Sequence, residues 1–445
     1  MSQLSGSGRP PSVAPGPEAE VVDICRDLLR IDTSNYGDGS GPGERAAAEL
    51  VAGLLDEVGL EPELFESAPK RASVVARVPG ADPSRPALLV HGHLDVVPAH
   101  AQDWQVDPFS ADVRDDCVWG RGAVDMKDMD AMILAVVRDL VRSGEPPPRD
   151  LVVAFLADEE AGGGLGATYI VRHRPELLEG VGEAVSEVGG FSTPIAGRRA
   201  YLLQTAEKGI AWLRLMAHGR AGHGSLVNDD NAVTRLCEAV ARIGTHPWPL
   251  RITSTVRAFL DGVEEITGVR LDPDDPDALV AVLGTTARFV GATLRTTANP
   301  TAVEAGYKHN VIPGSASALV DCRFLPGGEE ELMRTIAELA GPGVEVETVH
   351  RAVALEWPFE GDLVDAMVDA LRGEDPDAVV LPYCLSAGTD NKSFSAAGIV
   401  GYGFAPLRLP AGLDFAGMFH GVDERVPIDG LRFGVRTLGR FLRAC

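Results

Sequence analysis

The feature that most constrains the fold of this chain is a series of short apolar runs that alternate with segments of helical periodicity. Residues 44–58 and 129–141 repeat apolar side chains at helical spacing, and a glycine soon follows each segment. The apolar runs end at polar residues or glycines and cover residues 73–78, 87–91, 151–157 and 184–187. Strands that are apolar on both faces are typical of parallel sheets covered by helices. The sequence therefore predicts a mostly parallel α/β sandwich.

The pattern of apolar residues along the sequence changes near residue 200. Partly alternating strand patterns and one helical pattern follow one another in residues 200–217, 231–243 and 316–324. We therefore expect a smaller α+β domain that interrupts the α/β domain. The expected boundaries are 198–324 for the inserted domain and 19–197 with 325–445 for the two parts of the α/β domain.

The composition of the chain argues against several classes of partner and location. Lys and Arg number 40 against 65 Asp and Glu, which gives a formal net charge of −25 and argues against nucleic acid or anionic lipid as partners. We find neither an apolar stretch long enough to span a membrane nor a secretory signal, and the six cysteines are scattered. We therefore expect a cytoplasmic protein with free thiols. Residues 1–18, rich in Gly, Ser and Pro, predict a flexible tail.

One apolar run leads directly into polar residues that suit a metal site. In LLVHGHLDVVP, residues 88–98, the predicted strand is followed by His93 and Asp95. At a spacing of two, these side chains project to the same side of an extended segment. A carboxylate there can accept the second ring N–H of a metal-bound imidazole. This motif alone is a weak signal, because a lone histidine at a strand end is usually structural.

Further carboxylates and one histidine occur at comparable places. Glu159, Glu160 and Glu187 follow apolar runs, Asp125 precedes a predicted helix, and His420 lies among small and apolar residues. Each taken singly suits a helix cap or a solvated turn. Taken together, two histidines, a bridging carboxylate and two terminal carboxylates suit a pair of divalent ions such as zinc. Such a pair activates a water molecule, and Glu159 or Glu160 would then accept its proton.

The motifs HGHLDVVP, GRGAVDMKD, DEE, EVGG and FHG, in this order, resemble the metallopeptidase family of glutamate carboxypeptidase, aminoacylase and succinyl-diaminopimelate desuccinylase. Other phrases, such as EVGGF and AEKGIAWLRL, are closest to its carboxypeptidase S and N-fatty-acyl-amino-acid hydrolase branch. The resemblance implies a ferredoxin-like inserted domain that serves as a lid or for dimerisation, so a homodimer is one expected state. It leaves the role of residues 249–305 open.

The resemblance also implies roles for the residues of the centre. Asp125 would bridge two ions, and a non-proline cis peptide would follow it at Asp125–Met126. His93 and Glu187 would complete one metal site, and Glu160 and His420 the other. Glu159 would be the general base, and Asp95 would orient His93. Because Glu159 and Glu160 are adjacent at an extended strand end, we expect them to point in different directions.

For the substrate, the resemblance implicates residues of the inserted domain and of one later loop. His223, in GRAGHGS, would polarise the scissile carbonyl, and in dimeric members this histidine comes from the partner subunit. Without the resemblance, His223 reads as a turn histidine between glycines. Asn310 and Arg323 match substrate contacts, although Arg323 suits a surface ion pair equally well. Gly388 and Thr389 would present backbone N–H groups to an anion.

The expected function is hydrolysis of an amide bond beside a free carboxylate, in an N-acyl amino acid or a small peptide. The expected cofactors are two divalent ions, zinc first, with cobalt or manganese as alternatives. Three readings compete with this one: a succinyl-diaminopimelate desuccinylase type of deacylase, an enzyme with a single metal ion, and a non-catalytic binding protein on the same scaffold. Loss of catalysis is disfavoured because all five expected ligands and Glu159 are present.

Overall fold

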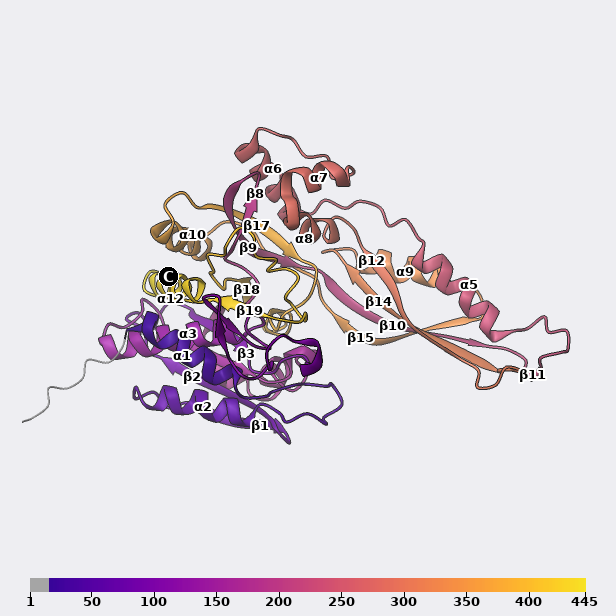
Figure 1. Cartoon of the computed structure of the whole chain (residues 1–445), viewed down its shortest axis with the longest axis horizontal. Coiled ribbons are helices and arrows are strands. Elements are labelled where there is room, and N and C mark those ends of the chain that lie inside the picture. The colour runs from indigo at the N-terminus through magenta and orange to yellow at the C-terminus, as the bar shows by residue number, and fades with distance from the viewer. Residues whose placement is uncertain (1–15) are drawn as a thin grey trace, which may run out of the picture.

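The structure is a computed structural model that describes residues 16–445, and its centre is a ten-stranded sheet (Figure 1). The strand order is β1-β2-β6-β3-β7-β18-β9-β16, and β17 and β8 also pair with β9. The bounds are β1 Glu63–Ala68, β2 Arg71–Val78, β3 Ala87–His93, β6 Leu151–Leu156, β7 Val181–Ser186, β8 Phe191–Ile195, β9 Arg198–Glu207, β16 Leu355–Glu356, β17 Val379–Leu385 and β18 Val400–Gly403.

The middle of this sheet is parallel, because the neighbouring strands β6, β3, β7 and β18 pair with one another in the same direction. β3 and β6 are buried along their whole length, as expected for strands covered on both faces. The predicted mostly parallel α/β sandwich is therefore confirmed. The run at 73–78 belongs to β2, which pairs with β6 in the antiparallel direction.

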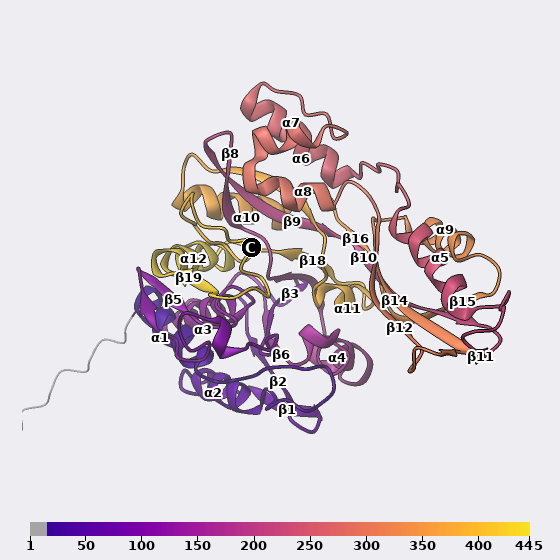
Figure 2. The same cartoon turned by 45° about the vertical axis from the view of Figure 1, so that its right-hand side comes forward.

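Helices cover both faces of the sheet (Figure 2). One layer contains α1, α3, α10 and α12, and the other contains α4 and α11. The helices of this body are α1 Pro17–Leu29, α2 Arg45–Asp56, α3 Lys127–Ser143, α4 Ala167–His173, α10 Asp362–Glu374, α11 Asn391–Ser395 and α12 Ile428–Leu442, with 3₁₀ turns η1 Ala101–Asp103, η2 Glu159–Ala161 and η3 Pro175–Leu178. A small separate sheet joins β4 Val113–Arg114, β5 Cys117–Trp119 and β19 Arg425–Pro427.

A second, four-stranded antiparallel sheet projects from the body (Figure 1). We call this projection the arm and define it as residues 209–244 and 297–352. Its strands are β12 Thr297–Ala305, β14 Ser315–Phe324, β10 Gly209–His218 and β15 Val344–Ala352, and its helices are α5 Ala232–Gly244 and α9 Glu329–Ala340. Alternate residues of β10 and β14 are buried, because the helices cover one face of this sheet only. β11 Gly222–His223 and β13 Val311–Ile312 pair at the far tip.

The strand pairing differs from the expected 198–324 boundaries of the inserted domain. β9 belongs to the large sheet, where it pairs with β17, β18 and β8. After residue 324 the chain stays in the arm, because β15 pairs with β10 as far as Ala352. β9 and β10 follow each other with only Lys208 between them, so hydropathy gives no sign of where the sheet changes.

The segment between the two parts of the arm returns to the body. It forms α6 Ser254–Thr267, α7 Pro276–Leu283, η4 Gly284–Thr286 and α8 Ala287–Ala292. Val256, Phe259, Leu260 and Val263 of α6 are buried in the same core as the large sheet, and α6 contacts β17. Most of the 249–305 segment, whose role the sequence left open, is therefore an extension of the body.

Three further expectations from the sequence concern the N-terminal segment, the cysteines and membrane-spanning helices. α1 begins at Pro17, so the last two residues of the predicted tail 1–18 are helical, and residues 1–15 lie outside the described residues. All six cysteines are free, as predicted. Among residues 16–445, no helix combines the length and the apolar character that crossing a bilayer requires.

The position of α6 leads to a stability prediction. Phe259 is 2% exposed, and Phe259→Ala should lower the free energy of unfolding by roughly 3–5 kcal/mol, the usual cost of a large cavity. Val280 of α7, 57% exposed, provides the control, because Val280→Ala should change it by no more than about 0.5 kcal/mol. Chemical denaturation monitored by circular dichroism measures both values. Equal, small effects would show that α6 does not belong to the body's core.

Candidate metal centre

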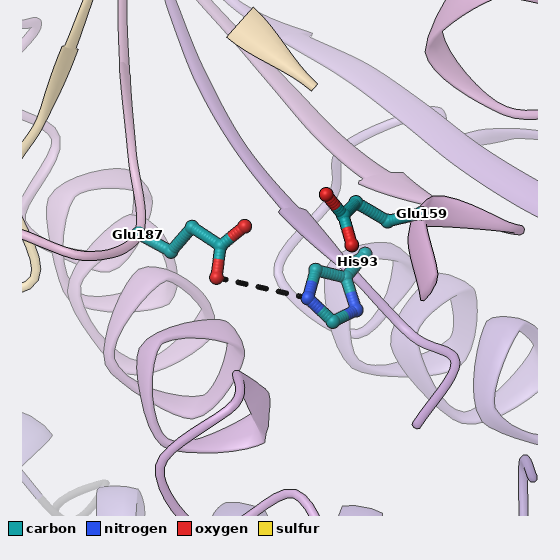
Figure 3. Close-up of side chains that lie close together, drawn as sticks. All are labelled: His93, Glu159 and Glu187. Carbon is teal, nitrogen blue, oxygen red and sulfur yellow. Dashed lines mark ion pairs between the residues drawn. The ribbon is translucent and has the colours of Figure 1, made fainter. Parts of the chain in front are cut away.

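Neighbouring parallel strands bring three acidic and imidazole side chains to one edge of the sheet. β3 ends at His93, Glu187 directly follows β7, and Glu159 lies in the turn after β6. Because β6, β3 and β7 are adjacent and parallel, their carboxyl ends meet, which is where α/β sheets bind ligands. Figure 3 shows these three side chains pointing toward one another.

Asp125 lies between the two candidate histidine ligands. Its Oδ1 is 3.2 Å from Nε2 of His93, and its Oδ2 is 3.3 Å from Nε2 of His420. Each histidine also faces a glutamate of its own: His93 lies 3.8 Å from Oε2 of Glu187, and His420 lies 3.1 Å from Oε2 of Glu160. The five expected ligands are thus together, with the aspartate central. The peptide bond Asp125–Met126 is cis, as the resemblance implied.

The electrostatics of this cluster fit divalent cations. Burial raises the pKa of Glu187 to about 8, and burial also raises the pKa of Glu159 well above its usual value. Oε1 of Glu160 is buried without a hydrogen-bond partner. Candidate ligand atoms lie within 4.8 Å of one another in two overlapping groups, His93 with Glu159 and Glu187, and His93 with Asp125 and Glu160. Carboxylates crowded in this way are satisfied when cations bind between them.

Glu159 and Glu160 occupy a tighter turn than expected. They form a 3₁₀ turn after Asp158, whose φ is +72°, so they do not continue the extended strand. The turn still separates their carboxylates: Glu160 contacts His420, whereas Glu159 groups with His93 and Glu187. The two side chains therefore point in different directions, as expected, but the cause is the 3₁₀ turn and not the geometry of an extended strand.

Asp95 was expected to orient His93 through its carboxylate, but its closest contact with the imidazole is made by its backbone oxygen. Nδ1 of His93 is 2.9 Å from the backbone oxygen of Asp95 and 3.6 Å from its Oδ1. The Asp95 carboxylate instead accepts the backbone N–H groups of Glu159 and Glu160, both at 3.1 Å. Asp95 thus positions His93 mainly through its main chain, and its side chain holds the turn that carries the two glutamates.

A buried polar network behind Asp95 was not predicted from the sequence. Asn35 Nδ2 donates to Asp95 Oδ2 at 2.9 Å, and Asn35 Oδ1 accepts a hydrogen bond from Arg71 Nη2 at 2.7 Å. Arg71 also forms a buried ion pair with Glu44. Neither the spacing nor the hydropathy of these residues distinguishes them from surface polar residues, because their partners come from distant parts of the chain.

A cavity of about 460 Å³ adjoins the centre and is lined by both the body and the arm. The body contributes Glu159, Glu160 and His420, together with Gly388 and Thr389 of the loop before α11 and Lys392 of α11 itself. The arm contributes Ile210, Trp212, Arg323 and His350. The rings of Trp212 and His350 contact each other in a tilted arrangement, with centroids 4.8 Å apart and an interplanar angle of 43°, and neither residue was predicted to line a site.

The predicted substrate contacts divide into those near the cavity and those far from it. His223 is exposed in β11 at the tip of the arm, where its Nδ1 lies 2.7 Å from Ser225 Oγ (Figure 1). Asn310 directly precedes β13 at the same tip. Within this single chain, the structure therefore does not bring His223 or Asn310 to the candidate ligands.

The other predicted contacts already have partners. Arg323 forms a two-point ion pair with Asp321 on the same strand, at 2.7 and 3.0 Å, as the alternative reading of Arg323 suggested. The backbone N–H and the hydroxyl of Thr389 both donate to buried Glu207, at 3.1 and 2.6 Å. The backbone N–H of Thr389 is thus directed at the Glu207 carboxylate, and its expected contact with a substrate anion stays a prediction. Gly388 lines the cavity.

The contacts of Asp95 lead to a second prediction. Asp95→Asn replaces an acceptor with an amide donor opposite the N–H groups of Glu159 and Glu160, so the turn that carries them should shift. Changes to residues that hold metal ligands typically lower metal affinity roughly 10–100-fold. Competition of the apoprotein with a chromophoric chelator measures this affinity. Asp56→Asn, on the surface of α2, is the control, and unchanged affinity in Asp95→Asn would contradict the assigned role.

Comparisons with known proteins agree with this geometry. The sequence model of peptidase family M20/M25/M40 matches residues 89–444. Aminoacylase-1 from Sus scrofa is 29% identical over 400 residues, which cover 88% of each chain. The N-fatty-acyl-amino acid synthase/hydrolase PM20D1 of Mus musculus is 27% identical over 417 residues, covering 86% of this chain and 80% of its own.

Among solved structures, the M20 family metallo-carboxypeptidase Sso-CP2 from Sulfolobus solfataricus is similar with a TM-score of 0.73 at 18% identity. The similarity covers 96% of this chain and 99% of the other. At this identity the likeness concerns the fold, and it extends over the body and the arm together.

Proposed function

We propose that this chain, which belongs to peptidase family M20/M25/M40, hydrolyses the amide bond beside a free carboxylate in N-acyl amino acids or small peptides. The family predicted from the motifs is confirmed, and with it the assignment as a hydrolase. The observation that carries the proposal is the position of Asp125 between His93 and His420, each with its own glutamate. This arrangement provides two adjacent sites that share one carboxylate.

In this proposal His93, Asp125 and Glu187 hold one divalent ion, and Asp125, Glu160 and His420 hold the other. Imidazole and carboxylate ligands suit zinc, with cobalt and manganese as alternatives. When bound, such a pair supplies an activated water molecule and polarises the carbonyl. Glu159 takes one proton from the attacking water and delivers it to the leaving nitrogen as the C–N bond breaks. The products are then a carboxylic acid and an amine.

The lining of the cavity supports a substrate that is both anionic and apolar. Ile210 and Trp212 provide an apolar wall that suits an acyl chain or an apolar side chain. Arg323 uses Nε and Nη2 for Asp321, and its Nη1 is not part of that pair. We propose that this guanidinium, with the backbone around Gly388, receives the substrate carboxylate. The names of the relatives, aminoacylase and N-fatty-acyl-amino acid hydrolase, favour the same class of substrate.

The test of this function is an activity screen of the zinc-loaded protein with N-acetyl, N-succinyl and long-chain N-acyl amino acids and simple dipeptides. Glu159→Gln should keep two metal equivalents and lower turnover on the order of 10²–10⁴-fold, because only the proton acceptor is lost. Glu160→Gln should instead lose one equivalent, as elemental analysis would show. The opposite pattern would reverse the two roles. Preference for N-succinyl substrates would favour the desuccinylase type, and a wild-type chain inactive on every amide would refute the proposal.

We propose further that the arm is a lid and dimerisation domain and that His223 acts in the centre of a second copy. The tetrahedral oxyanion formed on amide attack needs a donor besides the metal, and such a donor is typically worth about 3 kcal/mol. His223 lies between Gly222 and Gly224 on an exposed tip, so its backbone can approach another surface closely. The arm's position leaves this histidine outside the cavity of its own chain.

This proposal predicts complementation between subunits. His223→Ala should lower kcat roughly 100-fold, the usual loss for one oxyanion donor, and leave the metal content unchanged. Mixing His223→Ala with Glu159→Gln chains should restore part of the activity after subunit exchange, because one centre of a mixed dimer then has both residues. Exchange is followed with fluorescently labelled chains. No recovery despite proven exchange would place His223 in the same chain, and a wild-type kcat in His223→Ala would exclude it from catalysis.

A further inference from the structure

The loop that carries Asp125 is held by one buried carboxylate, that of Glu424. Glu424 is fully buried immediately before β19. Its Oε1 accepts the backbone N–H of Val124 at 2.7 Å and that of Asp125 at 3.2 Å. Its Oε2 accepts the N–H of Gly122 at 3.0 Å and Nη1 of Arg121 at 2.7 Å. Both oxygens thus take two hydrogen bonds each from the segment 121–125.

Arg121 extends this contact to the loop that carries His420. Arg121 is 3% exposed, and its Nη2 donates to the backbone oxygen of Gly421 at 2.7 Å. The indole ring of Trp104 covers its guanidinium at 5.2 Å. Gly421 is the residue directly after His420, so one guanidinium links Glu424 to the neighbour of a metal-ligand candidate. The backbone oxygen of Glu424 also accepts the N–H of Gly120 at 3.0 Å.

The remaining candidate ligands need no such link. His93 and Glu187 are fixed by neighbouring strands of the sheet, and Glu160 by the turn that Asp95 holds. Asp125 and His420 come from loops almost 300 residues apart in the chain, and the His420 side chain is 57% exposed. Yet their side chains approach to 3.3 Å. Arg121 and Glu424 join these two loops at positions adjacent to Asp125 and His420: Glu424 accepts the N–H of Asp125, and Arg121 donates to Gly421.

We infer that Glu424, together with Arg121, is a positioning residue that sets the separation of Asp125 and His420 and thereby the affinity of the metal site those two form with Glu160. This inference rests on the proposed metal assignment. A carboxylate is needed at this position because its two oxygens can accept four hydrogen bonds from a single buried point. An amide in its place would turn one acceptor into a donor facing N–H groups.

The test is titration of the apoprotein with Zn²⁺ in competition with a chromophoric chelator, and the absorption spectrum of the Co²⁺-loaded protein. In Glu424→Gln, one ion should bind roughly 10–100-fold more weakly, the usual effect of changing a residue that holds a ligand. It should be the same ion that His420→Ala loses, and the other ion, which shares Asp125, should weaken by a clearly smaller factor. Arg121→Lys, which keeps the charge and loses the fork, should shift the same ion by a smaller factor.

Glu20→Gln is the matched control, because Glu20 is a partly buried carboxylate paired with Arg142 at 2.7 and 2.8 Å where α1 packs on α3. It should destabilise the fold and leave both zinc affinities and the Co²⁺ spectrum unchanged. The inference is overturned if Glu424→Gln only lowers the unfolding temperature as Glu20→Gln does, or if both ions weaken by the same factor. A wild-type protein that does not bind two ions would instead refute the metal assignment itself, so the two failures are distinguishable.

Discussion

The repulsion among buried carboxylates around Asp125 is the constraint on which the rest of the structure depends. Glu159, Glu160 and Glu187 surround the aspartate and two imidazoles, in surroundings that raise the pKa of all three glutamates chiefly by burial. Left to itself, such a cluster would separate or draw in water. The backbone next to each of these side chains is instead fixed by the rest of the fold. Strand ends fix His93 and Glu187, the Asp95 carboxylate fixes the turn of Glu159 and Glu160, and Glu424 fixes the loop of Asp125. The surrounding architecture therefore opposes a local electrostatic cost that bound cations remove.

Part of this arrangement follows directly from the sequence, for a clear physical reason. A strand that is buried on both faces is mostly apolar until it leaves the sheet, so polar residues that follow an apolar run mark the edge of the sheet. His93 and Glu187 are such residues. Neighbouring parallel strands then bring these residues together without any information about tertiary structure. Asp125 and His420 carry no such mark: their residue types made them candidates, but only the resemblance of their motifs to a known family gave each a role in the centre.

Other features could not be predicted, because they depend on contacts between distant segments. Asn35, Arg71 and Glu424 are ordinary polar residues in the sequence, and only their buried partners distinguish them. Thr389 was expected to face a substrate anion, but its N–H donates to Glu207, the last residue of β9, which pairs with Leu385 at the end of the neighbouring strand β17. The inserted domain was placed too early because β9 and β10 form a nearly continuous strand pattern in which nothing marks the change of sheet. In the proposed dimer, the residues around His223 belong to the second copy of the chain, so a single sequence does not reveal them.

The junction between body and arm links the shape of the cavity to the position of the arm. Glu207, the last residue of β9, holds Thr389 and forms an ion pair with Lys392 at 2.8 Å. The ammonium of Lys392 also donates to the backbone oxygen of Lys208, the single residue between the two sheets. Lys208 in turn donates to the backbone oxygens of Ala292 and Arg295, where the chain re-enters the arm.

Two of the chain's crossings between body and arm therefore meet beside Thr389 and Lys392, which line the cavity next to the centre. Backbone oxygens buried at these crossings are satisfied by the lysine ammonium groups, and an ammonium group that lost these acceptors would remain buried without partners. The junction consequently resists being pulled apart, and rotation of the arm must carry the 388–392 loop with it or break these hydrogen bonds. Since Arg323 and Trp212 lie on the arm while Glu159 and His420 lie on the body, the relative position of the two parts sets the shape of the cavity that they line together.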